Sequence, residues 1–78
     1  MEPILLFKVK LGSISRGVYY KPQYGVIMEG VSTTGSVRAV ARHIANTEYS
    51  ACEVAKVNPG TLTDEDAIIQ AISEWIDK

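Results

Sequence analysis

Cys52 and His43 are the one cysteine and the one histidine of the chain, and a Cys/His pair is a common arrangement for nucleophilic catalysis. A cysteine and a histidine act together only when the fold brings them into hydrogen-bond reach and a third group orients the imidazole. Nothing in the spacing of these two residues requires such a contact. We interpret Cys52 as a small residue in or near a sheet and His43 as a residue on the solvated flank of a helix. The sequence therefore predicts a non-enzymatic protein with no catalytic residue.

Three consecutive carboxylates, Asp64, Glu65 and Asp66, form the densest acidic cluster. Clustered carboxylates can hold a hard cation or share a proton. Here they follow Thr63, a predicted N-cap, and carboxylates in the first turn of a helix interact favourably with its dipole. A chain with one cysteine and one histidine also cannot build a structural zinc site alone. We expect no metal and no cofactor.

The most unusual local composition surrounds Pro22, where three of the four tyrosines lie close to two cations. Tyrosine with arginine is enriched at protein interfaces, and aromatic faces beside cations also stack on unpaired bases. A third interpretation is structural, with the tyrosines covering the edge of a small core. We predict a protein-interaction module that binds or modulates a larger protein, and the alternative is a small single-stranded nucleic-acid-binding protein that uses this tyrosine-rich hairpin. The predicted partner-binding residues here are Arg16, Tyr19, Tyr20, Lys21 and Tyr24.

Charge is divided unevenly along the chain. Residues 1–46 contain six Lys and Arg against two Asp and Glu, whereas residues 47–78 contain two against seven. Arg38 and Arg42 lie one helical turn apart on one flank of a predicted helix, and we add them to the partner-binding residues. The alternative is that neighbouring helices compensate these charges internally. The net charge of -1 argues against binding nucleic acid by bulk positive charge.

A hydrophobic period of two from Ile4 to Leu11 predicts the first β-strand. The alternation assigns Leu5, Phe7 and Val9 to the core side and leaves Ile4 and Leu6 on the other side. Because 78 residues enclose only a small core, this second apolar side favours self-association, most simply as a homodimer.

The remaining elements follow from the same kinds of pattern. After a polar connector at 12–17, residues 18–21 and 24–29 predict two short strands or one bent strand, antiparallel to the first. Residues 36–45 have one apolar stripe and predict a helix. Residues 50–57 predict a third strand before the Asn58-Pro59-Gly60 turn. A second helix is predicted to begin after Thr63 as its N-cap and to run almost to the end of the chain.

The predicted order is β-β-α-β-α, an α+β fold in which two helices cover one face of a small antiparallel sheet of about three strands. The whole chain, 1–78, is predicted to form one small globular domain. We expect a core made of Leu5, Phe7, Val9, Val26, Met28, Val37, Val40, Ile44, Val54, Ile68, Ile72 and Trp75.

The order of elements resembles the short ββαβ accessory proteins of bacteriophages and mobile elements. The resemblance covers about residues 4–57 and rests on residues 7–10, 25–31, 37–41 and 52–57, which read Phe-Lys-Val-Lys, Gly-Val-Ile-Met-Glu-Gly-Val, Val-Arg-Ala-Val-Ala and Cys-Glu-Val-Ala-Lys-Val. It implies a protein that works by binding a larger host or phage component.

The composition sets the remaining expectations. A hydrophobic content of 46% with 22% charged residues is that of a folded domain. The longest apolar run, Ile4 to Phe7, is far shorter than the roughly 20 residues that span a bilayer, so we expect no membrane association. A lone cysteine favours a reducing compartment, and we predict a cytoplasmic protein.

Overall fold

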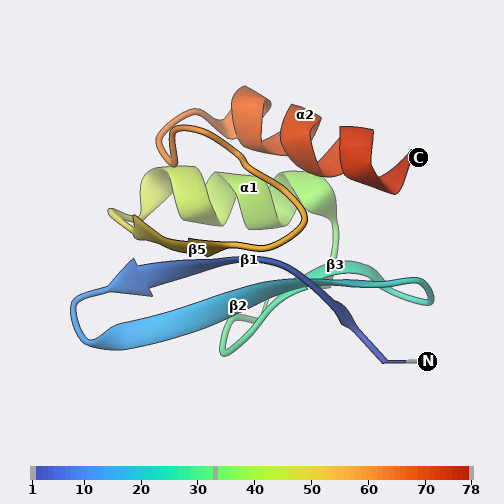
Figure 1. The fold of residues 1–78 in the computed structure, drawn as a ribbon, viewed down its shortest axis with the longest axis horizontal. Coiled ribbons are helices and arrows are strands. Elements are labelled where there is room, and N and C mark those ends of the chain that lie inside the picture. The colour runs from blue at the N-terminus through green and yellow to red at the C-terminus, as the bar shows by residue number, and fades with distance from the viewer. Residues whose placement is uncertain (1, 33, 78) are drawn as a thin grey trace.

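The computed structural model describes residues 2–32 and 34–77, apart from the side chains of residues 34, 35 and 51–53. These residues form an antiparallel sheet with two helices on one side of it, stacked so that the second helix lies outside the first (Figure 1). The elements in chain order are β1 (Ile4–Leu11), β2 (Ile14–Lys21), β3 (Gly25–Met28), β4 (Thr34–Gly35), α1 (Val37–Asn46), β5 (Ser50–Val54) and α2 (Glu65–Ile76).

The α+β class is confirmed, whereas the predicted order β-β-α-β-α is wrong. Within the described part of the chain the sheet has five strands in the order β4-β3-β2-β1-β5, and four of them precede the first helix. The chain breaks into two separate strands around Pro22, because the turn there closes with a hydrogen bond from the amide of Tyr24 to the carbonyl of Lys21, 2.9 Å long. The two-residue strand β4 then pairs with β3, and it lies between the predicted strand at 24–29 and the predicted helix at 36–45, where no strand was predicted.

The connector predicted at 12–17 is also shorter than expected. Strand β2 begins at Ile14, which pairs directly with Leu11, so only Gly12 and Ser13 form the turn. Gly12 has a φ of 62°, a conformation that glycine adopts without a steric penalty. Polar residues such as Ser15 and Arg16 therefore lie within a strand, because pairing with β1 outweighs their weak strand preference.

Strand β1 contains a β-bulge that changes which residues enter the core. Leu5 pairs with Tyr19 and Phe7 with Val18, so Leu6 is an extra residue without a partner in β2. A bulge places two successive side chains on the same side of a sheet. Leu6 and Phe7 are accordingly both buried, while Leu5 is only half-buried on the other side. The predicted places of Leu5 and Leu6 are wrong, and Leu6 gives no apolar outer surface for a dimer.

The carbonyl oxygen of Leu6 also fixes the segment that follows β5. It accepts hydrogen bonds from three successive backbone amides, those of Ala55 at 3.3 Å, Lys56 at 2.9 Å and Val57 at 3.2 Å. Because these amides turn together towards one oxygen, they cannot continue the ladder with β1. The strand therefore ends at Val54 and not at Val57 as predicted, and the side chain of Val57 turns into the core.

Helix α1 was predicted at 36–45 and begins one residue later, at Val37. The Oγ atom of Ser36 accepts a hydrogen bond from the amide of Ala39, 3.2 Å away, and so caps the helix. Helix α2 begins one residue later than predicted, because Asp64 and not Thr63 is the N-cap and accepts from the amide of Ala67 at 3.2 Å. The hydroxyl of Thr63 instead lies 2.9 Å from that of Thr61.

The core lies between the sheet and the two helices. Its buried apolar residues are Leu6, Phe7, Val9, Val18, Val26, Met28, Val40, Ala41, Ile44, Val57, Leu62, Ile68 and Ile72. Val37 and Trp75 are half-buried against this core. Val54, predicted to be buried, is 50% exposed at the end of the edge strand β5.

The bulge predicts that the same substitution costs much more stability at Leu6 than at the adjacent Leu5. Leu6→Ala removes a fully buried side chain and should lower the free energy of unfolding by about 2–5 kcal/mol through lost burial and a cavity. Leu5→Ala makes the same chemical change at a half-buried position and should cost less than about 1 kcal/mol. Urea unfolding followed by circular dichroism measures both. A larger loss at Leu5 than at Leu6 would mean that β1 alternates regularly.

Candidate functional site

The side of the sheet opposite the helices carries a transverse row of three apolar side chains. Leu5, Tyr19 and Ile27 are direct partners across β1, β2 and β3, and all three are half-buried. Their neighbours Val18 and Val26 point to the core, so the alternation of side chains along a strand places the row on the helix-free side. Among the described residues, no helix covers this side (Figure 1). We call the surface of this row and the lysines around it the open face.

Lysines extend from the open face beyond the apolar row. Lys8 and Lys10 alternate with the core residue Val9 on β1, and Lys21 lies at the far end of β2. The Nζ atom of Lys21 lies 4.8 Å from the centre of the Tyr24 ring, which is a cation–π distance. Tyr24 itself is 62% exposed at the β2–β3 turn.

The ring of Tyr19 lies flat along its own strand, above Gly17. A Cβ atom built at residue 17 would lie 2.5 Å from Cε1 of Tyr19, so only glycine leaves room for the ring in this position. Gly17 is buried as a consequence, although it lies on the helix-free side. The glycine thus leaves the space in which the aromatic ring lies against the sheet.

The sheet divides the tyrosine cluster that the sequence predicted. Tyr20 faces the helices, where its ring meets that of Trp75 edge to face with 5.6 Å between centroids, so it is part of the packing of α2. Arg16 lies on the same side of β2 as Val18, at the exposed end of the strand, and donates from Nη1 to the carbonyl of Glu29, 3.1 Å away. Tyr19 and Lys21 lie on the open face and Tyr24 lies at the adjacent turn. One predicted cluster therefore becomes two surfaces.

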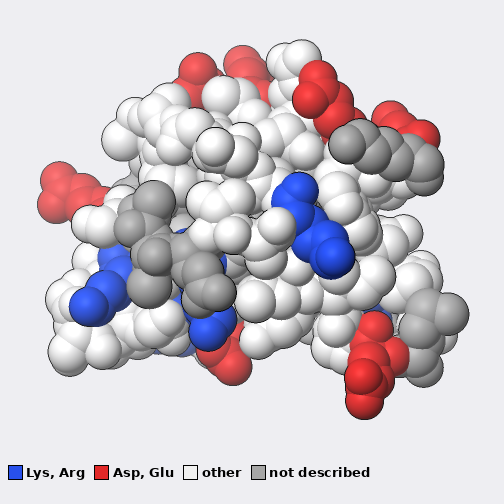
Figure 2. Space-filling model, in the orientation of Figure 1, with Lys and Arg blue, Asp and Glu red and all other residues white. Residues whose placement is uncertain are grey.

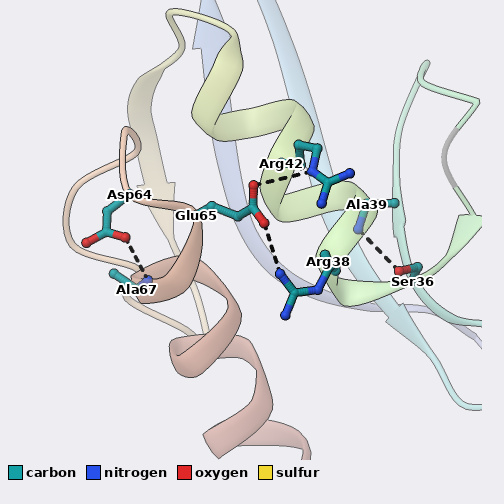
Figure 3. A network of polar contacts seen from close by, with 7 residues as sticks. All are labelled: Ser36, Arg38, Ala39, Arg42, Asp64, Glu65 and Ala67. Carbon is teal, nitrogen blue, oxygen red and sulfur yellow. Dashed lines mark hydrogen bonds and ion pairs between the residues drawn. The ribbon is translucent and has the colours of Figure 1, made fainter.

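Arg38 and Arg42 lie on α1 and face α2, away from the tyrosines. Nη1 of Arg38 is 3.2 Å from one carboxylate oxygen of Glu65, and Nε of Arg42 is 3.4 Å from the other (Figure 3). This arrangement is the internal compensation that the sequence offered as an alternative. Both arginine side chains are about 60% exposed, so each pair contributes at most about 1 kcal/mol.

The outer surface of α2 is an acidic stripe. Asp66, Gln70, Glu74 and Asp77 are exposed and recur every three or four residues, so they lie along one side of the helix. Nε2 of Gln70 donates to the Glu74 carboxylate at 3.2 Å. Figure 2 shows acidic side chains along the top of the molecule, where α2 runs, and lysine and arginine chiefly at the level of the sheet. Glu29, directly after β3, is also exposed, so acidic side chains are concentrated on α2 but not confined to it.

The histidine, the cysteine and the carboxylates considered for chemistry do not form a described site. Nε2 of His43 lies 3.0 Å from the hydroxyl of Tyr49, so the imidazole has a tyrosine partner. The side chain of Cys52 is outside the described residues. Asp64 caps α2, Glu65 pairs with the arginines and Asp66 points outward, so the three carboxylates have separate surroundings. Within the described part of the chain, no three His, Cys, Asp or Glu side chains group as metal ligands would.

A cleft of about 170 Å³ separates the segment after β5 from α2. It is lined by Lys56, Val57, Asn58, Ala71, Glu74 and Trp75. Pockets for small molecules usually enclose about 300–1,000 Å³, so this cleft is too small to be a typical one. No helix in the described residues has the length and apolarity needed to cross a membrane.

Leu5 and Ile27 were not predicted to lie on a surface. Leu5 was assigned to the core because the bulge was not recognised. The available signal was the apolar run at 4–7. A strictly alternating strand cannot place all of these side chains on the core side, so the run was compatible with an irregularity in β1. Ile27 lies between Val26 and Met28 in an unbroken apolar run, and such a run does not reveal which side of a strand is covered.

Comparison with known proteins identifies no relative. No family model matches the chain, and neither a curated protein nor a solved structure matches it. The functional argument therefore rests on the surfaces described above.

The position of Tyr19 over Gly17 predicts a coupling between the two residues. Gly17→Ala should lower the free energy of unfolding by no more than about 1 kcal/mol, because the new methyl group displaces only the far end of the half-buried Tyr19 side chain. In a Tyr19→Ala background, the same change should be neutral or stabilising, since glycine inside a strand costs roughly 0.5–1 kcal/mol relative to alanine. Urea unfolding of the four proteins measures the coupling. Equal effects in both backgrounds would show that the ring does not rest on residue 17.

Proposed function

We propose that the protein is a non-catalytic interaction module that binds an acidic surface of a larger protein through the open face. The observation that carries the proposal is the row of Leu5, Tyr19 and Ile27, which leaves apolar area outside the core of a small domain. Lys10 and Lys21 lie towards opposite ends of this surface. The open face thus has an apolar centre with lysines around it. It is complementary to a partner surface on which an apolar patch is bordered by carboxylates.

The binding energy in this proposal comes chiefly from the row. Tyrosine is enriched among the few residues that dominate interface energies, and its ring loses little conformational freedom on binding. Gly17 supports the proposal because it allows the Tyr19 ring to lie in one position before binding. The lysines contribute mainly to the rate and the orientation of association, since charges at the rim of an interface are screened by salt.

Other predicted partner-binding residues have structural partners and have no part in this contact. Arg16 bonds to Glu29, Tyr20 packs on Trp75, and Arg38 and Arg42 hold Glu65. Tyr24 remains beside Lys21 at the end of the open face. The proposal also retains the role that the resemblance to phage and mobile-element accessory proteins implies, namely binding a larger component.

The proposal predicts that Tyr19→Ala removes capture of the partner. The immobilised protein is incubated with extract of the cells that produce it, and mass spectrometry compares the bound proteins with those held by the variant. We expect a captured protein with an acidic surface to fall at least about tenfold, because loss of an interface hot spot costs 2 kcal/mol or more. Ile14→Ala is the matched control, since Ile14 is 51% exposed at the other end of the sheet, in the β1–β2 hairpin.

A second probe separates this proposal from binding of single-stranded nucleic acid. Tyrosine and lysine on an open sheet can also stack on bases and attract phosphates. We expect a short oligothymidylate to show no saturable binding at about 150 mM salt. Saturable, salt-sensitive binding that is lost in Tyr19→Ala would overturn the proposal, and so would unchanged protein capture by that variant.

A further inference from the structure

We infer that the acidic stripe of α2 on one copy of the protein docks on the open face of a second copy, head to tail. The inference rests on the open face of the proposed function. It adds a second copy of the protein, which competes with the partner for that face. The open face has Lys10 and Lys21, and the stripe has Asp66, Glu74 and Asp77. The two surfaces lie on opposite outer layers of the molecule, so each copy can use both of them (Figure 1).

The dimensions of the two surfaces agree. Lys10 pairs with Ser15, which lies six residues from Lys21 along β2, so the two lysines are about 20 Å apart at 3.3 Å per residue. The stripe runs from Asp66 to Asp77, which is about 17 Å at 1.5 Å per residue. Lysine side chains are long and flexible enough to cover the difference.

The apolar parts of the two surfaces also correspond. The row of Leu5, Tyr19 and Ile27 crosses three adjacent strands, a width of about 10 Å, and a helix with its side chains is about 10–12 Å across. Ile69 and Ile76 border the acidic stripe and are only half-buried. A helix laid on the open face would therefore place isoleucine near the row and carboxylates near the lysines.

Charge also selects the arrangement of the copies. A two-fold dimer through two open faces would oppose lysines to lysines, and one through two α2 stripes would oppose carboxylates to carboxylates. The head-to-tail contact alone pairs opposite signs. A head-to-tail contact builds rings or open chains, and it covers the open face of every copy except one at the end of an open chain. Self-association thus masks the surface that the partner needs.

The test is analytical ultracentrifugation at two salt concentrations. At about 0.01 M salt the Debye length is about 30 Å, and the average mass should rise with protein concentration; at about 1 M salt it is about 3 Å, and the mass should approach that of the monomer. An apolar dimer would persist at high salt, and that result would overturn the inference, as would a monomer at low salt.

Charge reversal identifies the two surfaces. Glu74→Lys with Asp77→Lys reverses the stripe near the C-terminus of α2, where cations suit the helix dipole. Lys10→Glu with Lys21→Glu reverses the open face. Neither variant should associate with itself at low salt. An equimolar mixture should form assemblies, because the basic stripe of one variant can pair with the acidic open face of the other. Glu48→Lys, an exposed change on neither surface, should associate as the parent does.

The same variants separate this inference from the proposed function. The stripe variant keeps the open face and should capture the partner at least as well as the parent. If that variant still self-associates, or if the mixture stays monomeric, the head-to-tail contact is wrong while partner capture is unaffected. If Tyr19→Ala captures the partner normally while the reversal results hold, the proposed function is wrong and the self-association stands.

Discussion

The carbonyl oxygen of Leu6 is shared by three backbone amides, and the arrangement of the whole molecule depends on this contact. The bulge at Leu6 takes this residue out of the pairing with β2. Its carbonyl then receives the amides of residues 55–57, which ends β5 and turns Val57 into the core. The following segment buries Leu62 before α2 begins. In a regular strand the carbonyl of residue 6 would bond within the sheet. It would then not be available to the amides of residues 55–57, which lie between the last strand and the last helix.

The position of α2 as an outer layer explains how charge is separated in space. Ile68 and Ile72 are fully buried beneath the helix, and Glu65 holds two arginines of α1. The pairs with Glu65 neutralise part of the basic flank of α1. Asp66, Glu74 and Asp77 remain exposed on the outside of α2. The outer side of α2 therefore carries much of the acidic charge of residues 47–78.

Periodicity was enough to predict β1 and both helices, because each has one side that faces the core. The helices begin within one residue of their predicted starts, since Ser36 and Asp64 supply local caps. The bulge was not predictable from alternation, because a period of two assigns every second residue to one side and has no place for an extra one. The end of β5 was missed for a related reason: its amides turn to a carbonyl about fifty residues earlier in the chain.

The candidate site shows the same limit at the level of surfaces. Tyr19 and Tyr20 are neighbours in sequence, yet a strand sends them to opposite sides of the sheet, one onto Gly17 and the other onto Trp75. Composition identified the aromatic segment, but only the pairing of strands shows that Tyr19 is aligned with Leu5 and Ile27. The bulge contributes here as well, because it turns Leu6 to the core while Leu5 stays beside Tyr19. The irregularity that anchors α2 on one side of the sheet thus also shapes the apolar row on the other.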